Sequence, residues 1–361
     1  MKIGLVGLNR TRKTTLFNLL TGKGEGALTA AGKASANIGA AAVPDNRIDF
    51  LSGLYRPKKT TYARIDLTDI AGLSATGAER GSSAAKFLDD ARDCDALVHV
   101  LRGFASDSVI HDLESVDPAR DLDIVESELL FADLELVDKR ISRIKAGKKI
   151  TKENAYELEI LQRCYDWLEN GVAMREAQLS PQEREALSNY AFLTDKPRIA
   201  VVNLDDYQWQ AGNWPNQDAL RSLCSRLNVP LLTLCALMEL EISRLPDEDK
   251  QMFLEDLGIE QPGITVLARA VYALLDLLSF LTVGDDEVKA WTIRRGTIAK
   301  HAAGKIHSDI ERGFIRAEVV KFDDLQALGS MAKVKENGLF RLEGKEYIVK
   351  DGDIINFRFN V

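Results

Sequence analysis

Residues 7–14 read Gly7-Leu8-Asn9-Arg10-Thr11-Arg12-Lys13-Thr14 and lie between an apolar run that ends at Val6 and another that follows Thr15. A buried strand that passes through a tight loop into a helix presents backbone N–H groups and a helix N-terminus to an anion. Lys13 and Thr14 have the spacing of the lysine and the hydroxyl residue in a phosphate-binding loop. The pattern predicts that a nucleotide contacts Asn9, Arg10, Thr11, Arg12, Lys13, Thr14 and Thr15.

Arg12 departs from this pattern, which has glycine immediately before the lysine. Glycine lets the loop backbone approach the phosphates closely and adopt positive φ. The motif is therefore altered at one position. Taken alone, this segment leaves open the alternative of an ordinary strand, turn and helix.

Length and composition limit the class of protein. With 361 residues, the chain is long enough for two or three domains that each have a core. Its residues are 45% hydrophobic and 28% charged, and no apolar run approaches the roughly 18 residues of a membrane helix. Met1 leads directly into a strand, so we expect neither a secretory signal nor a membrane partner. The net charge of −8 argues against nonspecific coating of nucleic acid, although it allows a local basic patch.

The four cysteines have no CxxC pairing and are too few for a disulfide framework. We expect reduced core thiols in a cytoplasmic protein. His99 is likewise expected in the core, within the apolar run 95–101. Residues 23–43 are rich in Gly, Ala and Ser and are expected to be a mobile loop, either a first switch or an ordinary linker.

Residues 62–72 alternate between apolar and polar side chains and end in Asp69-Ile-Ala-Gly72. An aspartate at a strand end can support a Mg²⁺ ion together with Thr14, and the glycine N–H can contact a γ-phosphate. The next residue is Leu73, where a Ras-like enzyme has a glutamine that orients the attacking water. Any hydrolysis must therefore use another group.

Two later strands are expected to carry residues that read the base. Residues 198–202 run into Asn203-Leu204-Asp205-Asp206, where GTPases have Asn-Lys-x-Asp. Residues 229–234 run into Cys235-Ala236, which can offer a backbone N–H to the base. These ordered motifs predict an α/β fold, the doubly wound sheet of a P-loop NTPase, with the ligand at the carboxyl ends of the strands.

Two heptad patterns separated by Gly147 predict an inserted antiparallel helical hairpin. The first runs from Leu130 to Ile144 and the second from Leu158 to Leu168. Its tip has no acidic residue between 139 and 152 and is suited to the phosphates of RNA. A solvated run of charges is the alternative. The basic residues of the tip are Lys139, Arg140, Arg143, Lys145, Lys148, Lys149 and Lys152.

From Leu281 onward, short alternating strands and turns predict a small α+β module. The expected strands are 288–293, 314–320, 347–349 and 354–359. Its balanced charges do not indicate a nucleic-acid site, and small-ligand sensing or protein docking is equally well supported. We expect a nucleotide-binding domain over 1–125 and 196–278, the hairpin over 126–195 and the module over 279–361.

Several long motifs are shared with one family. They include Asp69-Ile-Ala-Gly-Leu73, Ala303-Gly-Lys-Ile-His307, Glu311-Arg-Gly-Phe-Ile-Arg-Ala317 and Leu342-Glu-Gly-Lys-Glu-Tyr-Ile-Val-Lys-Asp-Gly-Asp353. With these motifs the chain resembles the Obg-like ATPase (YchF) family over essentially its whole length. The resemblance implies a GTPase-like domain with a helical hairpin and a C-terminal TGS domain of β-grasp type. It also implies a preference for ATP over GTP, association with ribosomes and a role in translation or stress regulation.

The resemblance also assigns roles to single residues. In this family a hydrophobic residue replaces the catalytic glutamine, as Leu73 does here, and a loop histidine proposed to assist hydrolysis matches His111. Five positions depart from the family, and two of them are Arg10 and Thr11, where the family has Asn-Val. Arg12 replaces glycine, Lys33 falls at the first-switch threonine, and Asp206 replaces glutamate. We therefore expect nucleotide binding with weak or absent hydrolysis.

The choice of base depends on Asp206 and its neighbours. A carboxylate accepts from guanine N1–H and N2–H₂, whereas adenine offers only its N6 amino group. Leu204 in place of lysine follows the family's departure from guanine-specific proteins. We expect ATP, with GTP as the alternative. Two functional classes remain, a slow ATPase switch and a degenerate P-loop scaffold that binds RNA or protein through the hairpin and the C-terminal module.

Overall fold

A computed structural model describes residues 1–22, 37–75, 80–106, 109, 111–147 and 151–360 of the chain. Lys33, Lys148 and Lys149, which the sequence analysis singled out, lie outside these residues. The described chain forms two compact units. Unit 1 comprises Met1–Gly39 and Asp66–Ile264, and unit 2 comprises Ala40–Ile65 and Thr265–Val361.

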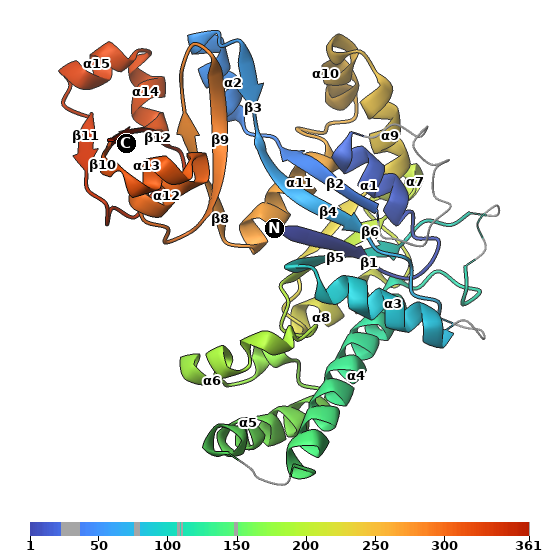
Figure 1. Cartoon of the computed structure of the whole chain (residues 1–361). Helices are drawn as coiled ribbons and strands as arrows, with labels where there is room; N and C mark the ends of the chain where they lie inside the picture. The colour runs from blue at the N-terminus through green and yellow to red at the C-terminus, as the bar shows by residue number, and fades with distance from the viewer. Residues whose placement is uncertain (23–36, 76–79, 107–108, 110, 148–150, 361) are drawn as a thin grey trace. The chain divides into compact units, whose positions relative to one another are not determined.

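A six-stranded sheet has the order β2-β4-β1-β5-β6-β7 (Figure 1). Its strands are β1 (Lys2–Val6), β2 (Asn37–Val43), β4 (Ala63–Asp69), β5 (Ala96–Arg102), β6 (Arg198–Asn203) and β7 (Leu231–Leu234). The pairs β4–β1, β1–β5, β5–β6 and β6–β7 are all parallel. Every residue of β5 and β6 is buried, as expected for central strands of a parallel sheet. The predicted α/β fold is confirmed, and the carboxyl ends of these strands meet at one edge.

Helices pack on both faces of this sheet. Apolar side chains of β1 and β5 share cores with α3, α4 and α8 on one face. On the opposite face, α1 packs with α9 (Figure 1). The helices of unit 1 are α1 (Lys13–Thr21), α3 (Arg80–Arg92), α4 (Pro118–Lys145), α5 (Lys152–Glu169), α6 (Pro181–Ala186), α7 (Asp206–Ala211), α8 (Gln217–Arg226), α9 (Ala236–Arg244) and α10 (Asp247–Asp256), with short 3₁₀ turns at Met174–Glu176 and Ser188–Tyr190.

Helices α4 and α5 form the predicted hairpin and bury one another's heptad side chains, including Val137 and Leu161. At its root the buried carboxylate of Asp133 on α4 accepts hydrogen bonds from the backbone N–H groups of Leu193 and Thr194, at 3.0 and 2.8 Å, and from the Thr194 hydroxyl at 2.8 Å. Three donors to one buried carboxylate fix where the hairpin leaves the sheet.

A second six-stranded sheet has the order β11-β10-β12-β8-β9-β3. The first and last long strands of the C-terminal module, β8 and β12, are parallel neighbours, while β9 and β10 run antiparallel to them. The strands are β3 (Lys59–Thr61), β8 (Leu277–Thr282), β9 (Glu287–Arg294), β10 (Phe314–Lys321), β11 (Arg341–Glu343) and β12 (Asp353–Phe359). The remaining helices are α2 (Asn46–Tyr55), α11 (Gly263–Leu274), α12 (Ala299–Ile306), α13 (Ser308–Arg312), α14 (Phe322–Leu328) and α15 (Met331–Glu336).

The structure corrects two predicted segments. Residues 37–43, expected within a loop, form β2, because pairing with β4 outweighs the weak strand preference of a Gly- and Ala-rich sequence. Residues 347–349, expected as a strand, form only an isolated bridge between Ile348 and Ile298. The contacts also group residues 40–65 with the C-terminal residues. The boundaries expected from the sequence assign residues 40–65 to the nucleotide-binding domain instead.

The expectations for the cysteines and for His99 are met. All four cysteines are buried free thiols, and His99 is buried within β5. Ser180 and Glu183 form both hydrogen bonds of a capping box at the start of α6. None of the helices in the described part of the chain combines the length and the apolar character that a membrane crossing needs.

The root of the hairpin gives a first prediction. Asp133→Ala leaves two buried N–H donors without an acceptor and should lower the free energy of unfolding by about 2 kcal/mol. Asp138→Ala, at an exposed position of the same helix, should change it by less than about 0.5 kcal/mol. Urea denaturation followed by circular dichroism measures both. Equal midpoints for the two variants would show that Asp133 does not anchor the hairpin.

Candidate phosphate-binding site

The loop between β1 and α1 has an unusual backbone. Gly7 has φ +142°, and a Cβ there would lie 2.4 Å from the carbonyl oxygen of Val100, so only glycine fits. Arg10 and Arg12 have φ values of 61° and 65°, in the left-handed region that costs a side-chain-bearing residue about 1 kcal/mol or more. Arg12 adopts the conformation for which the motif has glycine, and it does so with an arginine.

Lys13 lies at the start of α1 and folds back over the loop. Its Nζ donates to the carbonyl oxygens of Leu8 at 2.6 Å and Gly7 at 3.3 Å. Burial lowers the pKa of Lys13 to about 8, and the charge of Asp69 acts in the opposite direction. A buried ammonium beside the N-terminus of a helix is placed to meet an anionic ligand.

Thr14 and Asp69 meet at the carboxyl end of β4. The Thr14 hydroxyl donates to Asp69 Oδ2 at 2.8 Å. Burial raises the pKa of Asp69, whereas the bond from Thr14 and the charge of Lys13 lower it. A hydroxyl and a carboxylate are hard oxygen ligands that fit Mg²⁺. No cluster of three or more His, Cys, Asp and Glu ligands exists among the described residues, so phosphate and water oxygens would have to complete the shell of such an ion.

Gly72 and Leu73 attach the end of β4 to the phosphate loop. The Leu73 N–H donates to Gly7 O at 3.0 Å, and the Asn9 N–H donates to Leu73 O at 3.2 Å. A Cβ on Gly72 would lie 2.3 Å from Asn9 Oδ1, so the close approach requires glycine. The Leu73 side chain is buried in the core that also contains Leu8. It contacts apolar groups and cannot orient a water molecule.

Asn203, at the end of β6, connects three segments. Its Nδ2 donates to Thr11 O at 3.2 Å, and its Oδ1 accepts from the Ala236 N–H at 3.0 Å. Its backbone oxygen accepts from the N–H groups of Gly103 and Phe104. The predicted base-reading residues are therefore held against the phosphate loop.

The other predicted base-side residues differ in where their side chains lie. Cys235 Sγ donates to Asp206 Oδ1 at 2.9 Å, so the two predicted base-side positions are in contact. Burial raises the pKa of Cys235 to about 12, and the bond to Asp206 adds to this shift. The Leu204 side chain is instead buried in the core beneath α8. Leu204 can support the site only through its backbone, whose N–H donates to Leu234 O.

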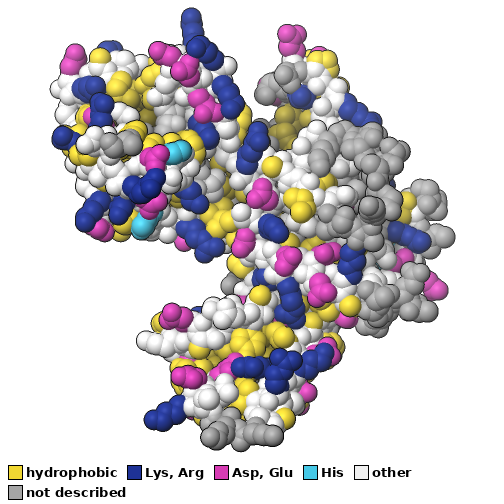
Figure 2. Space-filling view, viewed as in Figure 1, with side chains coloured by type: hydrophobic (Ala, Val, Ile, Leu, Met, Phe, Trp, Pro, Cys, Tyr) yellow, Lys and Arg dark blue, Asp and Glu magenta, His cyan; other side chains and the backbone are white. Residues whose placement is uncertain are grey.

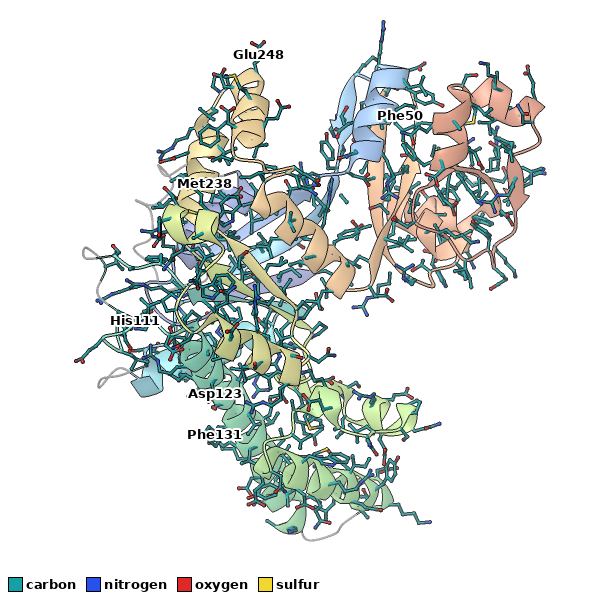
Figure 3. The ribbon with its side chains drawn as sticks, turned by 180° about the vertical axis from the view of Figure 1, so that it is seen from behind. Phe50, His111, Asp123, Phe131, Met238 and Glu248 are labelled. Atoms are coloured by element: carbon teal, nitrogen blue, oxygen red, sulfur yellow. The ribbon has the colours of Figure 1, made fainter. Side chains whose placement is uncertain are left out.

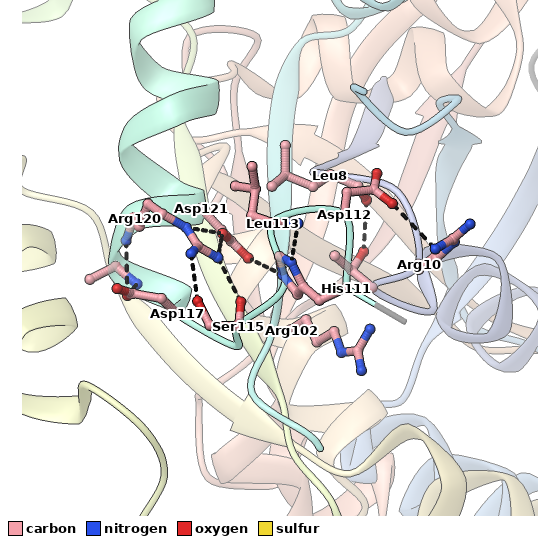
Figure 4. A network of polar contacts seen from close by, with 12 residues as sticks. Leu8, Arg10, Arg102, His111, Asp112, Leu113, Ser115, Asp117, Arg120 and Asp121 are labelled. Atoms are coloured by element: carbon pink, nitrogen blue, oxygen red, sulfur yellow. Dashed lines mark hydrogen bonds and ion pairs between the residues drawn. The ribbon is translucent and has the colours of Figure 1, made fainter. Parts of the chain in front are cut away.

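His111 is bonded at both ring nitrogens to neighbours along its own segment. Its Nδ1 accepts from the Leu113 N–H at 3.0 Å, so its Nε2 carries the proton and donates to Asp121 Oδ2 at 2.9 Å (Figure 4). Arg120 donates to the other oxygen of the same carboxylate. The adjacent Asp112 forms an ion pair with Arg10 of the loop at 3.4 Å. Both ring nitrogens of His111 are thus occupied in this conformation.

A cavity of about 440 Å³ opens on the phosphate loop. Four basic and two acidic side chains line it, so it favours an anion. Thr15, His111 and the base-side residues are not among its lining residues. Asn37, Lys86 and Asp90 are, and the motifs in the sequence gave no indication of them. The lining residues are Asn9, Arg10, Thr11, Arg12, Lys13, Thr14, Asn37, Asp69, Ile70, Ala71, Gly72, Lys86, Asp90 and Val109.

A larger hollow of about 660 Å³ lies at the root of the hairpin. Asp123 and Phe131, which follow one another along α4 in Figure 3, contribute to its lining. No residue of the phosphate loop lines it, and its acidic side chains outnumber its basic ones. It is therefore a poorer candidate for an anionic ligand than the smaller cavity.

The basic tip of the hairpin is partly neutralised. Lys139 pairs with Glu135 at 2.5 Å, and Arg140 pairs with Glu157 at 2.6 Å. Both acidic residues lie outside the 139–152 window, and the helical fold brings them to the tip. Arg143 and Lys145 are exposed. Figure 2 shows acidic side chains among the basic ones over this part of the molecule.

Known proteins similar to this chain cover its whole length. It is 42% identical to the ribosome-binding ATPase YchF of Bacillus subtilis over 99% of both chains. It is 40% identical to the protein of the same name from Haemophilus influenzae, over 100% of this chain and 99% of the relative. Residues 277–360 match the family model YchF-GTPase_C, described as a protein of unknown function. The structure of the Schizosaccharomyces pombe YchF GTPase aligns with a TM-score of 0.87 and 28% identity, covering 99% of this chain and 97% of that one.

Lys13 gives a second prediction. Its pKa is about 8 in the folded protein against a reference of 10.5, so the folded state holds this proton more weakly than the unfolded chain. The buried charge therefore lowers stability at pH 7, and this cost disappears as the pH rises from about 8 to about 10.5. Lys13→Met should raise the free energy of unfolding at pH 7 by about 1–3 kcal/mol.

The advantage of Lys13→Met should shrink as the pH approaches 10. Thermal unfolding between pH 7 and 10 measures it, with Lys2→Met, at an exposed position of β1, as the control. A stability difference that does not change with pH would contradict the assignment of a buried charge.

Proposed function

The chain belongs to the YchF family, and on this premise we propose that it is a nucleotide-binding switch protein that binds ATP, with GTP as the alternative, and acts on the ribosome. The observation that carries the proposal is the loop between β1 and α1. There Lys13 is buried at a helix N-terminus beside the Thr14–Asp69 pair, in a cavity whose basic lining side chains outnumber its acidic ones. This arrangement suits a triphosphate and a divalent ion.

The residues have distinct roles in this proposal. Lys13 and the N–H groups of the loop bind phosphate oxygens, while Thr14 and Asp69 would hold Mg²⁺. The ion neutralises charge on the phosphates when it is bound. Gly72, which approaches Asn9 of the loop closely, contacts the γ-phosphate in this proposal. The side of the site near Asn203, Asp206 and Ala236 receives the base.

Hydrolysis in this proposal is weak or absent. Leu73 offers no polar group to a water molecule, and His111 is bonded to Leu113 and Asp121. For His111 to accept a proton from a water, its Nδ1 must first be released from the Leu113 N–H, and for it to donate to a water, its Nε2 must be released from Asp121. Separating the buried His111–Asp121 pair costs free energy, so the protein with nucleotide bound but not hydrolysed is favoured.

Two observations support a ribosomal partner: the relatives are named ribosome-binding ATPases, and the tip of the hairpin is basic. Of the described tip residues, Arg143 and Lys145 are exposed and suited to RNA phosphates. A ribosomal partner places the protein in the cytoplasm. We propose that the C-terminal module is a TGS domain, because β8 and β12 are parallel neighbours at its centre. We also propose the division of the chain into a nucleotide-binding domain, a hairpin and this module.

A second candidate function is a degenerate scaffold that does not use nucleotide. The observation that favours it is Arg12, which holds a strained left-handed conformation with a large side chain where the motif has glycine. A scaffold would retain the fold and the hairpin while losing affinity for triphosphates. Direct binding measurements separate the two candidates.

Thr14 provides the test of nucleotide binding. Calorimetric titration of nucleotide-stripped protein with ATP and GTP, with and without Mg²⁺, should show Mg²⁺-dependent binding. Thr14→Ala should weaken binding about tenfold or more in Mg²⁺ and much less without it, because only the ion-dependent contacts are lost. Thr21→Ala, whose hydroxyl bonds to Phe17 O at the far end of α1, is the control. Absence of binding by the unmodified protein would favour the scaffold.

The hairpin tip provides the test of the ribosome partner. Reversing the charges of Arg143 and Lys145 to glutamate should weaken cosedimentation with ribosomes about tenfold and reduce its salt dependence, because phosphate contacts are lost. The matched control reverses Arg221 and Arg226, exposed on α8, with the same change in net charge. Equal effects of the two double variants would contradict a specific role of the tip.

A further inference from the structure

The hollow of about 660 Å³ at the root of the hairpin is lined along one side by a single face of α4. Six residues of this helix line it, at positions 123, 126, 127, 130, 131 and 134. Residues with this spacing of three and four lie on one face of a helix. The first, Asp123, and the last, Leu134, are about 16 Å apart along the helix axis. The hollow is therefore an elongated groove, the root groove, and Asp123 and Phe131 follow one another along it in Figure 3.

The chemistry of the root groove changes along its length. Asp123 and Glu126 form an acidic end. Beyond them, Leu130, Phe131 and Leu134 form an apolar end. Phe131 is 61% exposed, so a large apolar surface stays in water beside a concave site. An exposed aromatic side chain next to a hollow is typical of a binding surface.

Buried polar atoms at the acidic end lack partners. Glu126 Oε2 forms an ion pair with Arg198, whereas Glu126 Oε1 is buried and accepts no hydrogen bond from the residues that the structure describes. Arg175, which also lines the groove, donates from Nη1 to Thr194 O at 3.1 Å and from Nη2 to Leu227 O at 3.3 Å. Its Nε is buried and has no acceptor among those same residues. Because buried polar groups are normally paired, a ligand that brings both a donor and an acceptor fits this end.

The charges that line the root groove favour a cationic partner. Its acidic residues are Asp123, Glu126, Glu169 and Glu176, and its basic residues are Arg175 and Arg226. Arg175 is already bonded to two backbone oxygens and forms an ion pair with Glu176 at 3.4 Å. The excess of negative charge repels nucleic acid and attracts lysine and arginine side chains.

The length of the root groove favours a peptide. An extended chain rises about 3.3 Å per residue, so about five residues span the groove. Each residue of a peptide brings an N–H donor and a carbonyl acceptor, which suits the unpaired Glu126 Oε1 and Arg175 Nε. Glu126 and Phe131 are about 7.5 Å apart along α4, and side chains two positions apart on one side of an extended chain are separated by about 6.6 Å.

From this geometry we propose that the root groove binds an extended segment of a basic protein, with a lysine or arginine side chain against Asp123 and Glu126 and an apolar side chain two to four positions away against Phe131. A backbone carbonyl of the segment accepts from Arg175 Nε, and the apolar side chain covers the exposed ring. This inference goes beyond the proposed function, because it assigns a protein contact to the root of the hairpin and leaves the nucleotide site unchanged.

Fluorescence anisotropy of labelled peptides with the full chain tests the proposal. The probe is an eight-residue peptide in which arginine, phenylalanine and leucine occupy alternate positions, and it is used in both sequence orders because a segment can enter from either end. One matched peptide replaces the arginine by glutamate, and another replaces both apolar residues by serine. In one of the two orders the probe should bind at least tenfold more tightly than either matched peptide. Absence of probe binding in both orders, or equal binding of all peptides, overturns the proposal.

Variants at exposed positions locate the peptide without disturbing the core. Asp123→Lys and Phe131→Ser should each weaken probe binding at least tenfold. Two controls should leave it unchanged. Asp138→Lys makes the same charge reversal on α4 outside the lining residues, and Met252→Ser removes an apolar side chain of similar exposure, 59%, on α10. Probe binding that survives both groove variants places the peptide elsewhere and refutes the proposal.

Two other occupants are tested with the same variants. Phe131→Ser should not change the binding of a labelled uridine oligonucleotide, and it should not change the molar mass measured by sedimentation equilibrium. Loss of oligonucleotide binding in this variant would assign the groove to RNA. A fall in mass from dimer to monomer would assign it to a second copy of the chain. Either result overturns the assignment to a basic protein segment.

Discussion

The side-chain amide of Asn203 is the contact on which the site depends. It is buried, and it donates to Thr11 O while it accepts from the Ala236 N–H. Its backbone oxygen holds the segment that begins at Gly103. Because a buried polar group without a partner costs about 1–3 kcal/mol, these bonds keep the phosphate loop, the end of β5 and the start of α9 in one arrangement. The stable sheet thus positions a strained loop.

That loop stores energy which the remainder of unit 1 must offset. Arg10 and Arg12 have left-handed backbones, and the ammonium of Lys13 is buried with a lowered pKa. None of these features favours folding, whereas each provides a donor or a charge close to the cavity. Residues retained at the expense of stability are characteristic of functional sites. A bound anion would offset the free-energy cost of burying the Lys13 ammonium.

Much of the fold and part of the site could be predicted from local pattern. Parallel central strands are buried on both faces, so their apolar runs predicted β5 and β6, and the residues that follow such strands meet at one edge. The segment 37–43 was missed because only pairing with β4 makes it a strand. The partners of His111 and the direction of Arg12 were also beyond prediction. The bonds of His111 to Leu113 and Asp121 depend on loop geometry that no periodicity encodes, and the contact of Arg12 with Phe104 joins residues that are distant in sequence.

A crystal structure of the protein with Mg²⁺ and AMP-PNP tests the central claim most directly. The account predicts a β-phosphate within hydrogen-bonding distance of Lys13 Nζ and a metal ion bound by Thr14 and associated with Asp69. A structure obtained at saturating nucleotide that shows no phosphate on the loop would contradict it.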